Sequence, residues 1–313
     1  MKNLLLTAAL LAGFALTASA ADDNDQYQLK TGDITMTIDI SKGGKILSLK
    51  HQDREVISQS RFPESFGSTF WTSPQKEWNW PPVQEYDKMA YSVVERTDQK
   101  LSIRSQVSER MKYQIGKTFT TDAKKGAIVV TYSIKNMADA TRQVAPWEIT
   151  RVPNDNGLIF FDAPVESITP AGLMDFKAQG GAAWYNTDET NQNRKINADG
   201  HGWLAYLASP TGGGSEGWGG KEASPTGGGL EGALLLIKQF DDLDASAPAP
   251  GEAEIQVYVN RGKSYIELES QGAYTTLAPG QELTWTVRWM LVPVKSGTKQ
   301  AKLLKTVKKA LKH

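Results

Sequence analysis

Two stretches of the sequence gather side chains that could bind or react with a ligand. In the first, residues 66–82, three tryptophans fall within ten residues, and prolines exclude a long strand or helix. Indole faces can stack on the apolar faces of sugar rings, while amides and carboxylates can bond hydroxyl groups. This loop either presents its side chains to a ligand or buries them as a small core of its own. The candidate ligand-binding residues are Trp71, Gln75, Trp78 and Trp80.

The second stretch, residues 264–274, carries two carboxylates and a phenol at alternating positions. Tyr265, Glu267 and Glu269 alternate with Ile266 and Leu268. Because successive side chains of a strand point to opposite faces, the three polar residues share one face. That face is either a polar cleft or an exposed sheet surface. In a cleft, a carboxylate could act as a general base, and Tyr265 could contact the ligand.

The elements that must position these groups are strands. From residue 27 onward apolar and polar residues alternate with a period of two, and turn residues separate most of the stretches. A dozen or more strands without interleaved helices predict an all-β protein, a large antiparallel sandwich. Residues 298–313 are predicted to form a basic C-terminal helix that packs one apolar stripe on the sandwich.

The composition excludes several classes of protein. Thirty-five basic and 35 acidic residues cancel, so the chain lacks the basic field that a nucleic-acid partner requires. There is no cysteine, which excludes disulfides, zinc–thiolate sites and iron–sulfur clusters. Three histidines leave little material for a metal site, and we predict neither a metal nor a cofactor.

The N-terminus has the pattern of a secretory signal peptide. A short basic start precedes an apolar run from Leu4 to Thr17, and Ala18-Ser19-Ala20 supplies the small residues of a cleavage site. We expect residues 1–20 to be removed after Ala20, leaving a domain over residues 21–297 in a periplasmic or secreted protein. No later segment has the length and apolarity of a membrane span.

A glycine-rich segment, residues 209–232, contains a short tandem duplication. Both copies satisfy G-x-G-x-x-G in form. That motif binds phosphate only between a strand and a helix, and here an apolar strand-like run follows instead. The segment is therefore predicted to be a flexible surface insertion.

The order of several motifs resembles the galactose mutarotase-like superfamily, which includes the aldose 1-epimerases. The matching stretches are residues 34–50, 133–139, 145–151, 268–273 and 277–282. The resemblance implies a large β-sandwich with a sugar groove, in which a Glu-x-Gln segment supplies the catalytic base. Here Glu269 matches that base, with Glu267 as the other candidate. The tryptophan-rich loop further suggests a secreted bacterial branch.

The chain departs from the epimerases at their catalytic acid. Where they carry a histidine, this sequence has Trp147-Glu148, and Trp147 could contact the sugar. His201 and Glu148 are the remaining candidates for the acid, although His201 could equally be part of a glycine-flanked turn. Arg151 has the position to grip a sugar hydroxyl or carboxylate, or to form a salt bridge on the strand.

Two functions from different classes follow. The first is an exported protein that recognises a mono- or oligosaccharide without transforming it, in a binding or accessory role. The alternative is an aldose 1-epimerase-like or other carbohydrate-active enzyme that uses Glu269 as its base. The missing histidine favours recognition, and a scaffold that borrows only the fold stays open.

Overall fold

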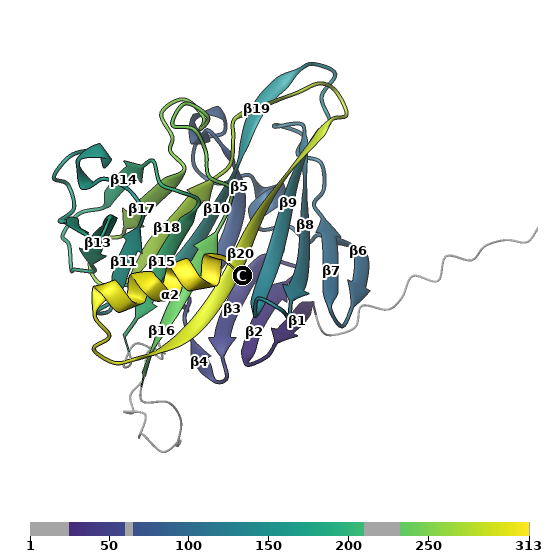
Figure 1. The fold of residues 1–313 in the computed structure, drawn as a ribbon. Coiled ribbons are helices and arrows are strands. Elements are labelled where there is room, and N and C mark those ends of the chain that lie inside the picture. Colours follow the sequence, from purple (N-terminus) through teal and green to yellow (C-terminus); the bar gives the residue numbers. More distant parts are fainter. Residues whose placement is uncertain (1–24, 60–64, 210–231, 313) are drawn as a thin grey trace, which may run out of the picture.

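A computed structural model describes residues 25–59, 65–209 and 232–312. Within these residues two ten-stranded antiparallel sheets face each other (Figure 1). The predicted signal peptide and nearly all of the glycine-rich insertion lie outside the described residues.

The first sheet contains strands from both segments with candidate binding or reactive residues, residues 66–82 and 264–274. Its order is β1 (Gln26–Thr31), β2 (Ile34–Asp39), β3 (Lys45–His51), β5 (Ser68–Ser73), β10 (Arg142–Pro153), β18 (Tyr265–Gln271), β17 (Ile255–Val259) and β14 (Arg194–Ala198). The short strands β4 (Arg54–Glu55) and β19 (Thr275–Leu277) pair with β3 and β10. The tryptophan-rich loop therefore leaves β5 next to β10, and the paired glutamates lie on the neighbouring strand β18.

The second sheet covers the first. Its order is β12 (Lys177–Gln179), β13 (Ala182–Asn186), β11 (Leu158–Phe161), β15 (Trp203–Ala208), β16 (Gly232–Gln239), β20 (Glu282–Lys295), β9 (Ala127–Asn136), β8 (Tyr113–Asp122), β7 (Lys100–Arg104) and β6 (Ser92–Thr97). The helical segments are η1 (Gln75–Glu77), α1 (Gln84–Asp87), η2 (Val165–Ser167) and α2 (Gln300–Lys312).

The core lies between the sheets and follows the period of two. Ile266 and Leu268 of β18 are fully buried in it, and Phe70 of β5 stacks on Tyr132 of β9 with ring centroids 4.3 Å apart. Since alternate side chains of each strand point inward, the remaining side chains of the first sheet form an outer face, on the side away from the second sheet. The predicted all-β antiparallel sandwich is confirmed.

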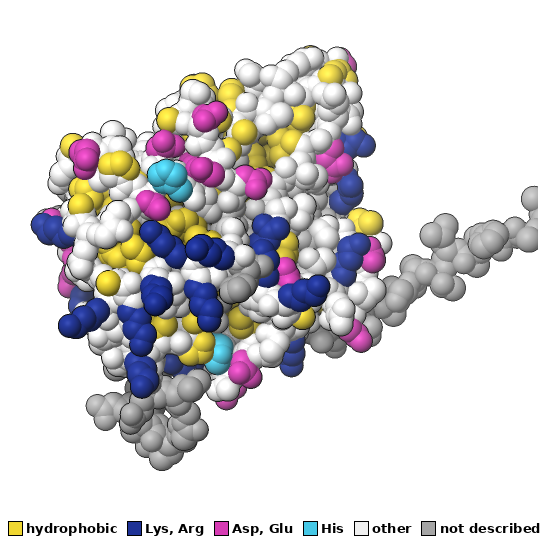
Figure 2. Space-filling view, in the orientation of Figure 1, with side chains coloured by type: hydrophobic (Ala, Val, Ile, Leu, Met, Phe, Trp, Pro, Cys, Tyr) yellow, Lys and Arg dark blue, Asp and Glu magenta, His cyan; other side chains and the backbone are white. Residues whose placement is uncertain are grey.

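Helix α2 covers the outer face of the second sheet. Its stripe of Leu303, Leu304 and Val307 is buried against residues of β11, β13, β15 and β16. Its lysines point outward and form a basic surface over the helix (Figure 2). The predicted C-terminal helix is thus present over residues 300–312. No helix within the described ranges is long and apolar enough to cross a membrane.

Candidate functional site on the outer face of the first sheet

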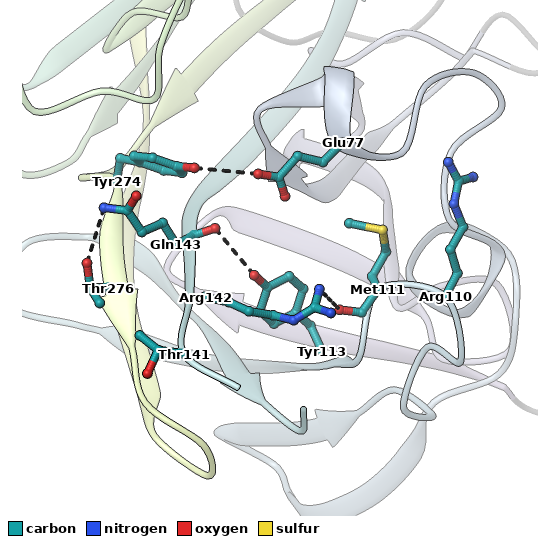
Figure 3. Close-up of a pocket in the computed structure, with 9 residues that line it drawn as sticks. All are labelled: Glu77, Arg110, Met111, Tyr113, Thr141, Arg142, Gln143, Tyr274 and Thr276. Atoms are coloured by element: carbon teal, nitrogen blue, oxygen red, sulfur yellow. Dashed lines mark hydrogen bonds between the residues drawn. The ribbon is translucent and has the colours of Figure 1, made fainter. Parts of the chain in front are cut away.

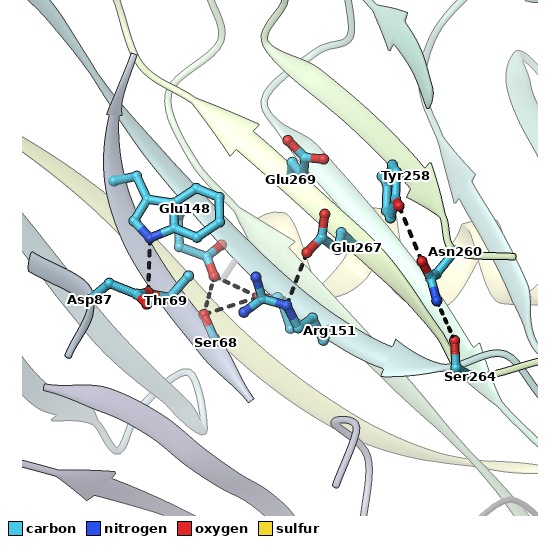
Figure 4. Close-up of polar contacts among 12 residues, drawn as sticks. Ser68, Thr69, Asp87, Glu148, Arg151, Tyr258, Asn260, Ser264, Glu267 and Glu269 are labelled. Carbon is cyan, nitrogen blue, oxygen red and sulfur yellow. Dashed lines mark hydrogen bonds and ion pairs between the residues drawn. The ribbon is translucent and has the colours of Figure 1, made fainter. Parts of the chain in front are cut away.

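The register of β5, β10 and β18 brings the predicted binding residues to one face. Trp147 lies opposite Trp71, and Arg151 lies opposite Glu267. Opposed residues of antiparallel strands project to the same side, and here it is the side away from the second sheet. Glu269 shares this side because it is two residues from Glu267 (Figure 4).

Four tryptophans form an aromatic cluster on this face. The centroid of Trp71 lies 5.6 Å from Trp78, 5.4 Å from Trp147 and 6.2 Å from Trp80, in edge-to-face geometry. Trp71, Trp78 and Trp147 are buried, whereas Trp80 is 69% exposed. Three of the four rings are therefore buried, as the core interpretation of the loop expects, and the fourth, Trp80, faces solvent, where it is free to contact a ligand.

Glu269 is held in the middle of the face by two donors. Its Oε2 accepts hydrogen bonds from the indole Nε1 of Trp147 at 2.8 Å and from Nζ of Lys195 at 2.9 Å. The side chain is only 1% exposed. Burial raises the pKa of Glu269, although Lys195 and the Trp147 bond act in the opposite direction. Lys195 also lies over the Trp147 ring, 4.7 Å from its centroid.

Glu267 forms a second ion pair beside the first. The Nε of Arg151 donates to its carboxylate at 2.9 Å, and the Arg151 guanidinium lies 5.7 Å from the centroid of Trp71 (Figure 4). Arg151 is therefore engaged in the strand-face salt bridge that was one of its two sequence interpretations. Tyr265 flanks this pair, with its ring 6.3 Å from Tyr258 of β17.

A third carboxylate, Asp87, closes the face at the tryptophan loop. It accepts hydrogen bonds from Thr69 at 2.8 Å and from the indole of Trp71 at 2.9 Å. Burial acts to raise the pKa of Asp87, but the charge of Lys45 and these two bonds outweigh it. The pKa of Asp87 consequently lies below its ordinary value.

Amide side chains continue the polar row beyond Glu269. Gln256 donates to Asn197 at 3.0 Å and to Glu252 at 2.8 Å, and Gln271 donates to the same Glu252 at 3.1 Å. The row therefore extends over β18, β17 and β14. Gln256 and Gln271 are themselves buried, so their hydrogen bonds fix the polar side chains of this face in place.

Glu148 lies on the opposite face of β10, between the sheets. Its carboxylate is ion-paired with Lys238 of β16, and both side chains are 0% exposed. It also accepts hydrogen bonds from Ser68 and, at 2.6 Å, from Thr150. The sheet itself thus separates Glu148 from Glu269, which removes the geometry that an acid–base pair would need.

The other two predicted residues lie at the margins. His201, in the connection between β14 and β15, is exposed, and its Nδ1 lies 3.0 Å from the carbonyl oxygen of Asp162. That bond raises the pKa of His201. Gln75 is half-buried in η1 at the base of the tryptophan loop. The structure groups Trp71, Trp78, Trp80, Trp147, Arg151, Glu267 and Glu269, with Tyr265 beside them.

The sequence predictions missed Lys195, Asp87 and Gln256. Lys195 lies on β14, a strand of five residues with little alternation, so its periodic signal is weak. Nothing in the sequence pairs β14 with β17 and so brings this lysine to Glu269. In the described part of the chain no three His, Asp or Glu side chains come close enough together to hold a metal ion.

Comparison with known proteins gives structural relatives only. No family model matches the sequence, and no curated protein matches it significantly. A candidate aldose 1-epimerase from Escherichia coli K12 superposes with a TM-score of 0.57 at 13% identity, covering 86% of this chain and 99% of its own. A galactose mutarotase-like protein from Lactobacillus casei gives 0.54 at 13% identity, covering 85% and 100%. A galactose mutarotase related enzyme from Lactobacillus acidophilus gives 0.54 at 10% identity, covering 88% and 99%.

These identities are too low to carry a residue's role from one protein to another. The overlap nevertheless includes nearly the full length of each relative and most of this chain. The relatives show the architecture alone: the chain has the galactose mutarotase-like fold.

Proposed function

We propose that this protein is exported and recognises a saccharide on the outer face of its first sheet. One observation carries the proposal: an exposed tryptophan, Trp80, stands at the edge of a row of ion-paired and amide side chains. An indole face can cover the apolar face of a sugar ring, while Lys195 and Glu267, whose side chains are 34% and 14% exposed, would bond its hydroxyls.

The state of Glu269 favours recognition over catalysis. In the predicted epimerase chemistry a base takes the proton of the anomeric hydroxyl and an acid protonates the ring oxygen. Where the resemblance expects the acid histidine, this sequence has Trp147-Glu148; a neutral indole N–H does not serve as a general acid, and Glu148 is buried in its ion pair with Lys238. Glu269 is instead bonded to that indole and to Lys195, which fixes the carboxylate as an acceptor within a binding surface.

Export is proposed from the N-terminal sequence alone. Residues 1–20 have the order of a basic start, an apolar run and a small-residue cleavage site. Expression in a bacterial host followed by fractionation and N-terminal sequencing tests it. A periplasmic or secreted product beginning at Ala21 supports export, and a cytoplasmic product beginning at Met1 contradicts it.

Titration of the intrinsic tryptophan fluorescence against a panel of mono- and oligosaccharides tests recognition. A ligand that quenches the fluorescence should bind about fivefold more weakly to Trp80→Ala, because loss of one stacked ring costs about 1 kcal/mol. Val94→Ala, an exposed residue of β6 on the other sheet, is the control. Absence of binding across the panel, or equal affinity of the two variants, contradicts the proposal.

The alternative, an aldose 1-epimerase, is favoured by a different observation. Glu269 has a raised pKa, which suits a general base, and Lys195 supplies an acid that the sequence did not reveal. Glu269 would take the proton of the anomeric hydroxyl while Lys195 protonates the ring oxygen as the ring C–O bond opens. Exchange NMR on fresh aldoses measures this. Acceleration lost in both Glu269→Gln and Lys195→Met would establish the enzyme and displace the binding-only proposal.

A further inference from the structure

A cavity of about 760 Å³ lies beside the tryptophan loop, at the beginning of β10 (Figure 3). Its walls come from η1, the end of the β7–β8 connection with the first residue of β8, the start of β10 with the residue before it, and β19 with the segment that precedes it. None of the predicted site residues lines it. The cavity is a separate concave surface, open to solvent, and Tyr113 brings the second sheet into its lining.

One wall of the cavity is cationic. The Nη1 of Arg142 donates to the carbonyl oxygen of Met111 at 3.2 Å, and its guanidinium lies 5.8 Å from the centroid of the Tyr113 ring. These contacts orient the guanidinium while leaving further N–H groups of its five for a ligand. Arg110 lines the same cavity from the preceding turn and is exposed.

The facing wall combines a carboxylate, a phenol and an amide. Tyr274 donates to Glu77 through a long hydrogen bond of 3.5 Å, and Gln143 donates to the hydroxyl of Thr276 at 3.2 Å (Figure 3). Burial raises the pKa of Glu77, while Tyr274 and Arg142 act to lower it. Two guanidinium groups against one carboxylate leave the cavity with a net charge of +1 when Glu77 is ionised.

We propose that this cavity binds the carboxylate-bearing unit of an acidic saccharide, such as a uronic acid residue. Arg142 and Arg110 would bond the carboxylate, since guanidinium N–H groups match its two oxygens. Glu77, Gln143 and Thr276 would bond the hydroxyls, and the partly exposed Tyr274 ring would contact the apolar part of the sugar ring. The inference rests on the proposed saccharide recognition and narrows it to an anionic ligand.

The position of the cavity fits a ligand that continues from the outer face. Glu77 is adjacent in sequence to Trp78, whose ring lies 6.4 Å from Trp147. Along β10, Gln143 precedes Trp147 by four residues, or about 13 Å of strand. A saccharide of several units could therefore reach from the Trp80 surface into the cavity.

Paired ligands test the proposal at low ionic strength. Methyl glucuronide and methyl glucoside, and digalacturonate and galactobiose, differ within each pair by the carboxylate. Binding is followed by calorimetry and by the arginine Nε–Hε resonances of the labelled protein. The acidic member should bind at least tenfold more tightly and shift the Arg142 resonance. Arg142→Met and Arg110→Met should each remove most of this preference. Because Arg110 is exposed, the second substitution should leave the fold intact, which circular dichroism checks.

Lys302→Met, which removes one positive charge from exposed α2, is the control and should leave the preference unchanged. Equal affinity for the acidic and neutral members, or a preference that survives Arg142→Met, overturns the proposal. Displacement of the acidic sugar by an equal concentration of acetate or inorganic phosphate would assign the cavity to free anions and also overturn it. If Trp80→Ala weakens neutral and acidic sugars alike while the pairs do not differ, saccharide recognition stands and only the acidic subsite fails.

Discussion

The buried ion pair between Glu148 and Lys238 tests whether the inner face of β10 stabilises the core while its outer face forms the candidate binding site. The pair joins the sheets across the core, and both side chains are fully buried. Lys238 also donates to the carbonyl oxygen of Leu268 at 3.0 Å, and Thr150 donates to Glu148 at 2.6 Å. Desolvation of both charges is offset only while each retains the other as its partner.

Replacement of Lys238 by methionine keeps most of the side-chain volume and leaves the Glu148 carboxylate with hydroxyl donors but no counter-ion. The expected loss is about 3–5 kcal/mol of the free energy of unfolding. The double variant Lys238→Met/Glu148→Gln removes both charges and should recover most of that loss, because no buried charge is left unpaired. Glu148→Gln should also leave saccharide affinity unchanged, since the residue faces away from Glu269.

Urea unfolding followed by circular dichroism and by tryptophan fluorescence measures these differences. The two probes must agree before a free energy is extracted from a chain of this length. A loss below about 1 kcal/mol in Lys238→Met, or a double variant less stable than the single one, would refute the reasoning. A Glu148→Gln variant that folds normally but fails to bind sugar would return Glu148 to the site.

Three further predictions concern the fold. Glu254 accepts the backbone N–H groups of Gly202 and Leu243, and burial raises its pKa to about 7. The folded state therefore binds the proton of the Glu254 carboxyl more tightly than the unfolded state does. The stability that protonated Glu254 contributes is complete below about pH 4.3, the pKa of an unperturbed glutamate, and is lost as the pH rises through 7. Glu254→Gln should flatten the decline of Tm between pH 5 and 8, and an unchanged slope would contradict the assignment. If α2 packs as described, Leu303→Ala should lower the free energy of unfolding in urea by about 2–5 kcal/mol. The exposed neighbour is the control, and Lys302→Ala should lower it by less than about 0.5 kcal/mol. Gly157→Ala should cost about 1–3 kcal/mol, because a Cβ there would lie 2.4 Å from the Tyr206 ring, and a variant as stable as the parent would contradict that contact.

The sandwich was predictable because its long strands repeat a simple period. Ile34, Met36 and Ile38 alternate with polar residues, and all three are buried in the structure. The sequence does not predict short strands such as β12 and β14, because three to five residues with little alternation show no clear period. The same limit hid Lys195, whose role depends on which strand β14 pairs with.

The candidate site was predictable in part. The shared face of Glu267 and Glu269 follows from their spacing within one strand, and the structure places them so. The alternation also puts Trp147 and Glu148 on opposite faces, but the sequence does not reveal which face is inside, because β10 is buried along almost its whole length. Lys238 is a single cation within the apolar run of β16, and its ion pair with Glu148 shows that Glu148 faces the core. That pairing depends on how the two sheets stack, which the sequence does not reveal.

The indole N–H spectrum of the ¹⁵N-labelled protein tests saccharide recognition on this face most directly. The Trp147 resonance reports its hydrogen bond to Glu269, and the Trp80 resonance reports the exposed edge of the aromatic cluster. A bound saccharide should shift both and leave Trp184 and Trp203, under helix α2, unchanged. A saturating saccharide that shifts only Trp184 or Trp203, or that leaves the Trp80 and Trp147 resonances in place, would contradict the site.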